Sequence, residues 1–214
     1  LADAHQTYQG MSCLVVRADE IYNEFSSGTP DATAYRRFLK MLYDRGSDGG
    51  RRPTHLLLFG ACRFDNRMVS TKFRHLNPDD YLLCVESEVS NNDPQSFCWE
   101  DYFGLMADGK GGSYGRDVSD LAIGRMPVTT ADEAQLVVNK TIAHLARTYA
   151  GDWSNRVVVI GDDDTPKEGG DKHTDQANKI GDAIGKIAPR RMVEKEFLDS
   201  YEAKSDGTRT TYPE

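Results

Sequence analysis

The sequence has 214 residues, of which 38% are hydrophobic, enough for one large core or two small ones. Its formal net charge of -8 leaves no basic surface to neutralise phosphates, which argues against a nucleic-acid partner. The longest apolar run, at Val157–Ile160, is far shorter than the roughly 20 residues of a membrane-spanning helix. We therefore expect no transmembrane segment in these residues, and because the chain begins with Leu1 and shows no signal-peptide pattern, we expect it to be a piece of a longer protein.

Apolar runs and helix-start signals predict alternating strands and helices at the front of the chain. Met11–Val16 is an apolar run that follows a glycine and predicts a buried strand. Thr29–Asp31 combines a capping residue, a proline and an acid, which is typical of a helix N-terminus, and helical spacing then continues to Gly46. His55–Phe59 predicts a second strand.

The middle of the chain is less regular. Strand-like pieces occur at Tyr81–Val85 and Tyr102–Met106, among residues typical of turns and loops. Leu121–Val128 predicts a further strand. Thr130–Glu133 has the pattern of a capping box and therefore predicts the start of a helix.

The last part of the chain returns to clear alternation. Beyond Gly151, Arg156–Ile160 and Met192–Phe197 predict two strands separated by an acidic loop and a helix. The inner face of that helix is predicted to carry Ala177, Ile180, Ile184 and Ile187. Alternating strands and helices predict an α/β fold, with a mostly parallel sheet covered by helices on both faces. We place a boundary near Gly151, which gives two parts, residues 1–150 and 151–214.

The four cysteines are Cys13, Cys62, Cys84 and Cys98. They form no C-x-x-C pair and have no histidine at zinc-finger spacing, so we expect no metal site built on them. Cys13 and Cys84 lie in apolar runs, which favours free thiols over a disulfide. Cys62 follows a strand end, as the caspase nucleophile does, but the sequence places neither a histidine nor a helix-borne positive charge beside it. We expect an inert loop thiol, with a nucleophile as the alternative.

An acidic run follows the strand Arg156–Ile160. Ligands of open α/β sheets bind beyond the carboxyl ends of the strands, which makes Asp162, Asp163 and Asp164 a candidate site. These carboxylates could hold Ca²⁺, although Pro166 interrupts the usual calcium-loop pattern. A solvated turn that caps the next helix is the alternative.

His173 is the other candidate at this edge of the sheet. Helical spacing places it on the same face as Ala177, in the first turn, so it is predicted to point towards the sheet end. A buried, hydrogen-bonded histidine and a site residue are both consistent with that position.

Three segments, Thr54–Arg67, Trp99–His144 and Asn155–Ile180, resemble the gingipain-type (C25) cysteine peptidases and occur in that family's order. Ile21–Asp44 resembles the family's branch of PorU-type sortases of type IX secretion. The resemblance implies a caspase-like α/β fold with two side-by-side subdomains, the second of them incomplete in this chain. It also implies cleavage of peptide bonds by a cysteine thiolate paired with a histidine.

The resemblance also assigns roles to residues of this chain. Asp163 matches the place where arginine-cleaving members hold an acid near the catalytic histidine, and Asp162 and His173 match substrate-binding positions. The family's histidine lies in an Asn-Tyr-x-Gly-His-Gly strand end and its cysteine one strand later, and neither segment occurs before Glu214. We therefore expect the 214-residue chain to be inactive alone.

The implied function is the N-terminal part of an endopeptidase and transpeptidase that processes secreted cargo on the outer cell surface. Its partner would be a protein or peptide substrate, such as a cargo sorting domain. No cofactor is expected, and Ca²⁺ is the one candidate ion. The alternative is a non-catalytic caspase-like module that binds a protein partner.

Overall fold

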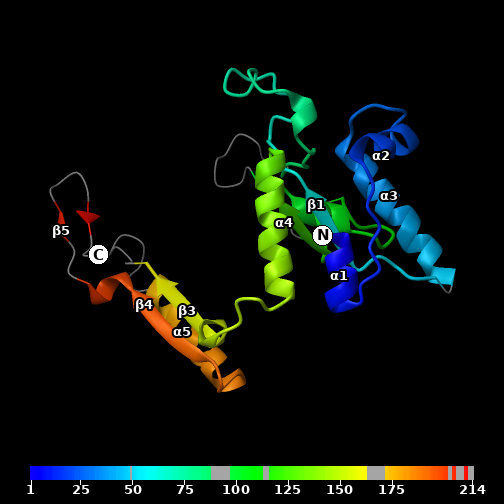
Figure 1. Ribbon diagram of the computed structural model, residues 1–214. Helices are drawn as coiled ribbons and strands as arrows, with labels where there is room; N and C mark the ends of the chain where they lie inside the picture. The colour runs from blue at the N-terminus through cyan, green and yellow to red at the C-terminus, as the bar shows by residue number, and fades with distance from the viewer. Residues whose placement is uncertain are drawn as a thin grey trace. The chain divides into compact units, whose positions relative to one another are not determined.

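The computed structural model describes residues 1–48, 50–87, 97–112, 116–162, 172–201, 204–205 and 210–211 (Figure 1). The chain divides into two compact units, Leu1–Ala146 and Arg147–Glu214, and each is described by itself. Their correspondence to the expected subdomains, residues 1–150 and 151–214, remains a prediction. None of the helices in the described parts has the length and apolar content that crossing a bilayer requires.

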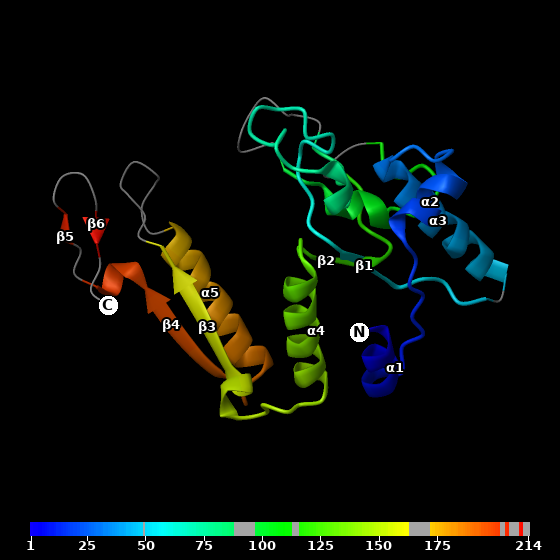
Figure 2. The same cartoon turned by 45° about the horizontal axis from the view of Figure 1, so that its top comes forward.

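The first unit contains α1 (Ala2–Gln9), α2 (Ala18–Phe25), α3 (Ala32–Arg45), β1 (His55–Phe59), β2 (Ala122–Met126) and α4 (Ala131–Leu145), with short 3-10 helices η1 (Gly46–Asp48), η2 (Pro78–Asp80) and η4 (Glu100–Gly104). β1 and β2 pair in parallel, with Leu57 opposite Gly124. Within this unit α3 lies on one side of the small sheet and α4 on the other (Figures 1 and 2). The strands predicted at His55–Phe59 and Leu121–Val128 are confirmed as β1 and β2.

Of the two long helices of this unit, α4 begins at its predicted capping residue, whereas α3 is capped by Asp31 and not by the predicted Thr29. The side chain of Asp31 accepts a hydrogen bond of 2.8 Å from the backbone amide of Thr33, at the start of α3. Thr130 and Glu133 form the predicted capping box of α4. Each bond satisfies an amide that has no partner within the helix, so these helix starts are defined locally.

The core of the first unit joins α3, β1 and the region before β2. Phe103 and Met106 are fully buried, and the Tyr35 ring from α3 lies 5.7 Å from the Phe103 ring. The Tyr35 hydroxyl also makes a short hydrogen bond with the hydroxyl of Tyr22, which ties α2 to α3. The buried cluster comprises Tyr35, Leu39, Leu58, Leu83, Phe103, Met106 and Leu121.

Three predicted strands of the first unit are wrong. Met11–Val16 has no regular structure, and Leu14 and Val15 are exposed. Tyr81–Val85 forms no strand, while Tyr102–Met106 begins in the 3-10 helix η4 and ends in a buried turn. The apolar pattern alone does not distinguish an exposed segment or a buried turn from a strand.

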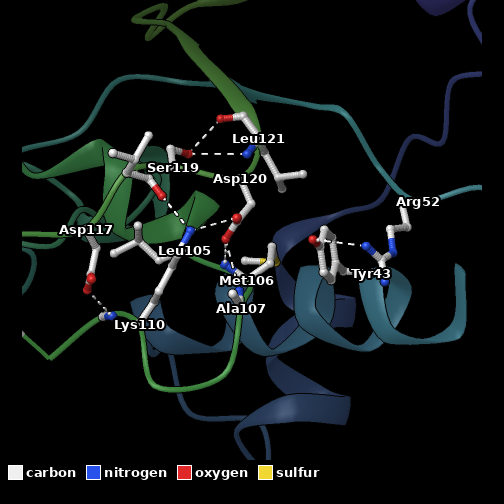
Figure 3. A network of polar contacts seen from close by, with 12 residues as sticks. Tyr43, Arg52, Leu105, Met106, Ala107, Lys110, Asp117, Ser119, Asp120 and Leu121 are labelled. Atoms are coloured by element: carbon white, nitrogen blue, oxygen red, sulfur yellow. Dashed lines mark hydrogen bonds and ion pairs between the residues drawn. The ribbon is translucent and has the colours of Figure 1, made fainter. Parts of the chain in front are cut away.

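The buried turn before β2 is held by one carboxylate (Figure 3). Asp120 accepts hydrogen bonds from the amides of Met106 and Ala107, at 2.8 and 3.0 Å, and from Lys110 Nζ at 2.7 Å. Burial opposes ionisation of Asp120, but these bonds outweigh it and lower the pKa of its carboxyl. The turn therefore depends on an ionised Asp120, and it positions the start of β2.

The second unit contains η5 (Asp152–Asn155), β3 (Arg156–Gly161), α5 (Lys172–Ile187), β4 (Met192–Phe197), η6 (Leu198–Ser200), β5 (Lys204–Ser205) and β6 (Thr210–Thr211). β3 and β4 pair in parallel and α5 connects them, as predicted. A Cβ on Gly161 would lie 3.1 Å from the Cα of Thr174, so glycine permits the close approach of α5 to the end of β3.

The inner face of α5 differs from the prediction. Its buried residues are Ala177 and Gly181, whereas Ile180 is 56% exposed and Ile187 84% exposed. Small residues occupy the contact because the helix lies close to the sheet: a Cβ on Gly181 would meet the side chain of Lys195 at 2.8 Å. The apolar spacing predicted the helix and the burial of Ala177 correctly, but it placed Ile180 and Ile187 on the inner face wrongly.

Candidate functional site

The carboxyl edge of β3 is where the sequence placed the candidate site. Asp162 directly follows β3 and is exposed, and its backbone carbonyl accepts a 3.0 Å hydrogen bond from Thr174 Oγ1 of α5. This bond ties the strand end to the first turn of the helix. Asp163 and Asp164 lie outside the described residues, so their roles, including a calcium site, stay predictions.

His173 lies in the first turn of α5, beside the same edge. Its side chain is exposed, so the prediction that it points inwards is wrong. Helical spacing puts His173 on the same stripe as the buried Ala177 and Gly181, but His173 lies at the end of that stripe and stays exposed. Because the first turn of α5 contacts the end of β3, Asp162 and His173 both lie at an accessible edge where a substrate could reach them.

The turn after β1 is the second place where chemistry could occur. Pairing with the chain beyond β2 continues past the strand, because the amide of Ala61 donates to the carbonyl of Val128 at 2.9 Å. The carbonyl of Ala61 in turn accepts from the amide of Leu82 at 2.9 Å. The backbone just before Cys62 is therefore held by hydrogen bonds to two other segments.

Three cysteines meet at this turn. The sulfur atoms of Cys62, Cys84 and Cys98 all lie within 4.8 Å of one another, and those of Cys62 and Cys98 are 3.9 Å apart. The sequence did not indicate this cluster, which forms in part because a bridge between Glu86 and Cys98 pairs two separate segments. No spacing rule reveals such a cluster, since each thiol comes from a different segment.

Arg125 of β2 provides a positive charge near these thiols. Its guanidinium makes two hydrogen bonds to the carboxylate of Glu100, at 2.9 and 3.1 Å. It also donates to the carbonyls of Gly60 at 3.0 Å and Leu83 at 3.2 Å. The side chain of Arg125 is 10% exposed, so this ion pair joins β2, η4 and the turn after β1 in a poorly solvated place.

The three thiols differ in acidity. A hydrogen bond from Cys84 and the charge of Arg125 lower the pKa of Cys62 to about 6, against the opposing effect of burial. The pKa of Cys84 is raised by the same hydrogen bond and by burial, and that of Cys98 is raised by burial. Cys62 is therefore the first of the three to ionise, which differs from the expected inert thiol.

We predict that alkylation of Cys62 by iodoacetamide in the reduced, metal-free chain will reach half its plateau rate at about pH 6. A free cysteine does so at about pH 8.5. The plateau rate itself should be modest, because the nucleophilicity of a thiolate falls with its pKa. Peptide mass spectrometry of the labelled protein would measure this profile, and a midpoint above about pH 8 would refute the assigned charge state.

The caspase-like alternative for Cys62 needs an imidazole to accept the thiol proton. Among the described residues, the group that gathers here consists of three cysteines and contains no histidine. An ionised thiol without such a partner is a ligand or a redox group rather than a complete catalytic dyad.

The comparisons with known proteins agree with this geometry. The model of peptidase family C25 matches residues 1–214. Among solved structures, the chain is similar to dimeric latent PorU from Porphyromonas gingivalis, with 36% sequence identity and a TM-score of 0.60. The match covers 72% of this chain and 15% of that chain, so the chain spans a small part of that protein. No curated protein matches.

The mixed α/β architecture, with parallel strands in small sheets flanked by helices, fits the caspase-like fold of the PorU structure. The family match extends over the whole chain, and the fold agrees with it in both units. The chain belongs to peptidase family C25, the gingipain-like cysteine peptidases.

Proposed function

We propose that this chain is the N-terminal part of the peptidase region of a PorU-like cysteine endopeptidase and transpeptidase. The observation that carries the proposal is the C25 match over residues 1–214, together with 36% identity to PorU. The catalytic histidine and cysteine are supplied from outside these residues. The substrate is a secreted protein whose sorting domain is removed, and the enzyme works at the outer cell surface as part of type IX secretion.

In this reaction a thiolate attacks the peptide carbonyl, and the imidazolium protonates the departing amine to leave an acyl-enzyme. Water completes hydrolysis, whereas an amine that attacks the acyl-enzyme completes transpeptidation. The carboxyl edge of β3 contributes the supporting groups. Asp163 orients the imidazole and stabilises its charged form, while Asp162 and His173 contact the substrate beside the scissile bond.

We predict that the complete protein cleaves a peptide with a cargo sorting-domain junction, and that the purified 214-residue chain does not. A peptidase without its nucleophile and base retains only binding, and uniform binding does not lower the barrier to the chemical step. Cleavage can be followed by mass spectrometry of the products. Cleavage by the 214-residue chain itself would overturn the proposal.

The alternative, a non-catalytic caspase-like module, predicts binding of the same peptide without cleavage by either form. That outcome would be recognised by a measurable affinity in titration calorimetry and by intact peptide after prolonged incubation.

A further inference from the structure

The cysteine cluster at the turn after β1 is not used by the proposed peptidase chemistry. Its three thiols come from the segments 60–67, 81–87 and 97–99, all within the first unit. The cluster is partly shielded, because Cys84 is buried and the other two are half-buried. A group of three thiols in such a place calls for a chemical explanation of its own.

The sulfur spacing fits a bound ion. Zinc–sulfur bonds of about 2.3 Å in tetrahedral geometry place neighbouring sulfurs about 3.8 Å apart. The 3.9 Å between Cys62 and Cys98 is close to that value, and the 4.8 Å limit on all three pairs requires only small side-chain adjustments. A disulfide would require two of these sulfurs to approach to about 2.05 Å, which leaves the third unpaired.

The backbone around the thiols is held in place by other residues. Asn66 binds the backbone of Cys84 in both directions, accepting from its amide at 3.0 Å and donating to its carbonyl at 2.9 Å. Cys98 is fixed by the bridge to Glu86, and Cys62 follows the doubly bonded Ala61. Because the ligand positions are set before an ion arrives, little ordering is needed on binding.

Cation binding at this cluster depends on the ionisation of its thiols. Metal ligands must be thiolates, and three thiolates in a shielded place repel one another. The positive charge of Arg125 reduces that repulsion, although the carboxylate of Glu100 partly neutralises this charge. Cys84 and Cys98 hold their protons in the absence of an ion, so a divalent or soft monovalent cation would displace those protons as it binds.

We propose that Cys62, Cys84 and Cys98 form a three-thiolate site for one thiophilic ion, Zn²⁺ or Cu(I). Soft thiolate ligands select these ions over Ca²⁺ and Mg²⁺. On Zn²⁺ the fourth position is left to water or another ligand, whereas Cu(I) accepts three thiolates alone. By joining three segments of the first unit, the ion would stabilise that unit independently of whether the complete protein is a peptidase.

The test uses the 214-residue chain, reduced and freed of metal under anaerobic conditions. Zn²⁺ and, separately, Cu(I) are titrated against a chromophoric chelator, and we expect one ion per chain with one of them. Cys62→Ser and Cys98→Ser should weaken that affinity at least about 100-fold. The matched control Cys13→Ser, at an exposed cysteine outside the cluster, should leave it unchanged.

A second measurement does not depend on the folding of a variant. In the unaltered chain, the bound ion should protect Cys62, Cys84 and Cys98 from alkylation while Cys13 is labelled at its usual rate. It should also raise the melting temperature by mass action. The proposal is overturned if neither ion binds, if both serine variants bind as well as the unaltered chain, or if a Cys62–Cys98 disulfide forms in place of ion binding.

Discussion

Replacing Arg125 by methionine is expected to lower the free energy of unfolding by about 3 to 5 kcal/mol. The Arg125 side chain is 10% exposed and that of Glu100 28% exposed, so neither charge is freely solvated. Methionine leaves Glu100 without its two hydrogen bonds, and it also removes the donor to the carbonyls of Gly60 and Leu83. Urea unfolding followed by circular dichroism would measure the loss.

The second unit offers a matched control. Arg156 also makes a two-point ion pair across a pair of parallel strands, with Glu194, but its side chain is 53% exposed. Arg156→Met should therefore lower the free energy of unfolding much less than Arg125→Met does. If Arg125→Met destabilised the protein no more than Arg156→Met, the ion pair of Arg125 with Glu100 would not stabilise the first unit as we infer.

The same substitution should change the chemistry of the cysteine cluster. Because the charge of Arg125 helps lower the pKa of Cys62, Arg125→Met should move the alkylation midpoint of Cys62 to higher pH. Arg125→Lys keeps a charge but loses the two-point geometry, so its midpoint should shift less. The two variants thus separate charge from packing.

In the complete protein, Asp163→Asn is expected to lower kcat/KM by about 10- to 1000-fold without unfolding the protein. The carboxylate would hold the catalytic imidazole in one tautomer and stabilise the imidazolium that partners the thiolate. Asparagine keeps the shape but removes the charge. The effect is smaller than loss of the nucleophile because an orienting acid assists the reaction and does not itself react.

The position of Asp163 motivates this expectation. It follows Asp162, which lies at the carboxyl edge of β3, where α/β sheets bind their ligands. His173→Ala should change which peptides are cut, because His173 is exposed at the same edge. Asp175→Asn is the control, since Asp175 lies in α5 with an exposed side chain paired to Lys179. If the first two variants kept their activity and selectivity but melted at a lower temperature, Asp163 and His173 would serve only to cap α5.

Local patterns predicted the second unit well. β4 has the predicted bounds, Met192–Phe197, and β3 extends the predicted strand by Gly161 alone. In a βαβ unit the two strands and their connecting helix are neighbours in sequence, so each element's own pattern is sufficient to find it. The place of Gly181 on the contact face of α5 was missed because a glycine contributes nothing to an apolar pattern.

The first unit shows where sequence patterns fail. Met11–Val16 has the composition of a buried strand, yet Leu14 is 68% and Val15 79% exposed. Whether an apolar run is buried depends on what packs against it, and the run itself contains no such information. The cysteine cluster was missed for a related reason: its members approach through the bridge of Glu86 with Cys98, a contact between separate segments.

The most direct test of the peptidase assignment is to label the complete protein with a peptide-based, thiol-reactive affinity reagent and identify the modified cysteine by mass spectrometry. We expect a single modified cysteine outside residues 1–214, loss of cleavage in proportion to labelling, and the same result in a Cys62→Ser background. Substrate-dependent labelling at Cys62, with cleavage abolished by Cys62→Ser, would contradict the account.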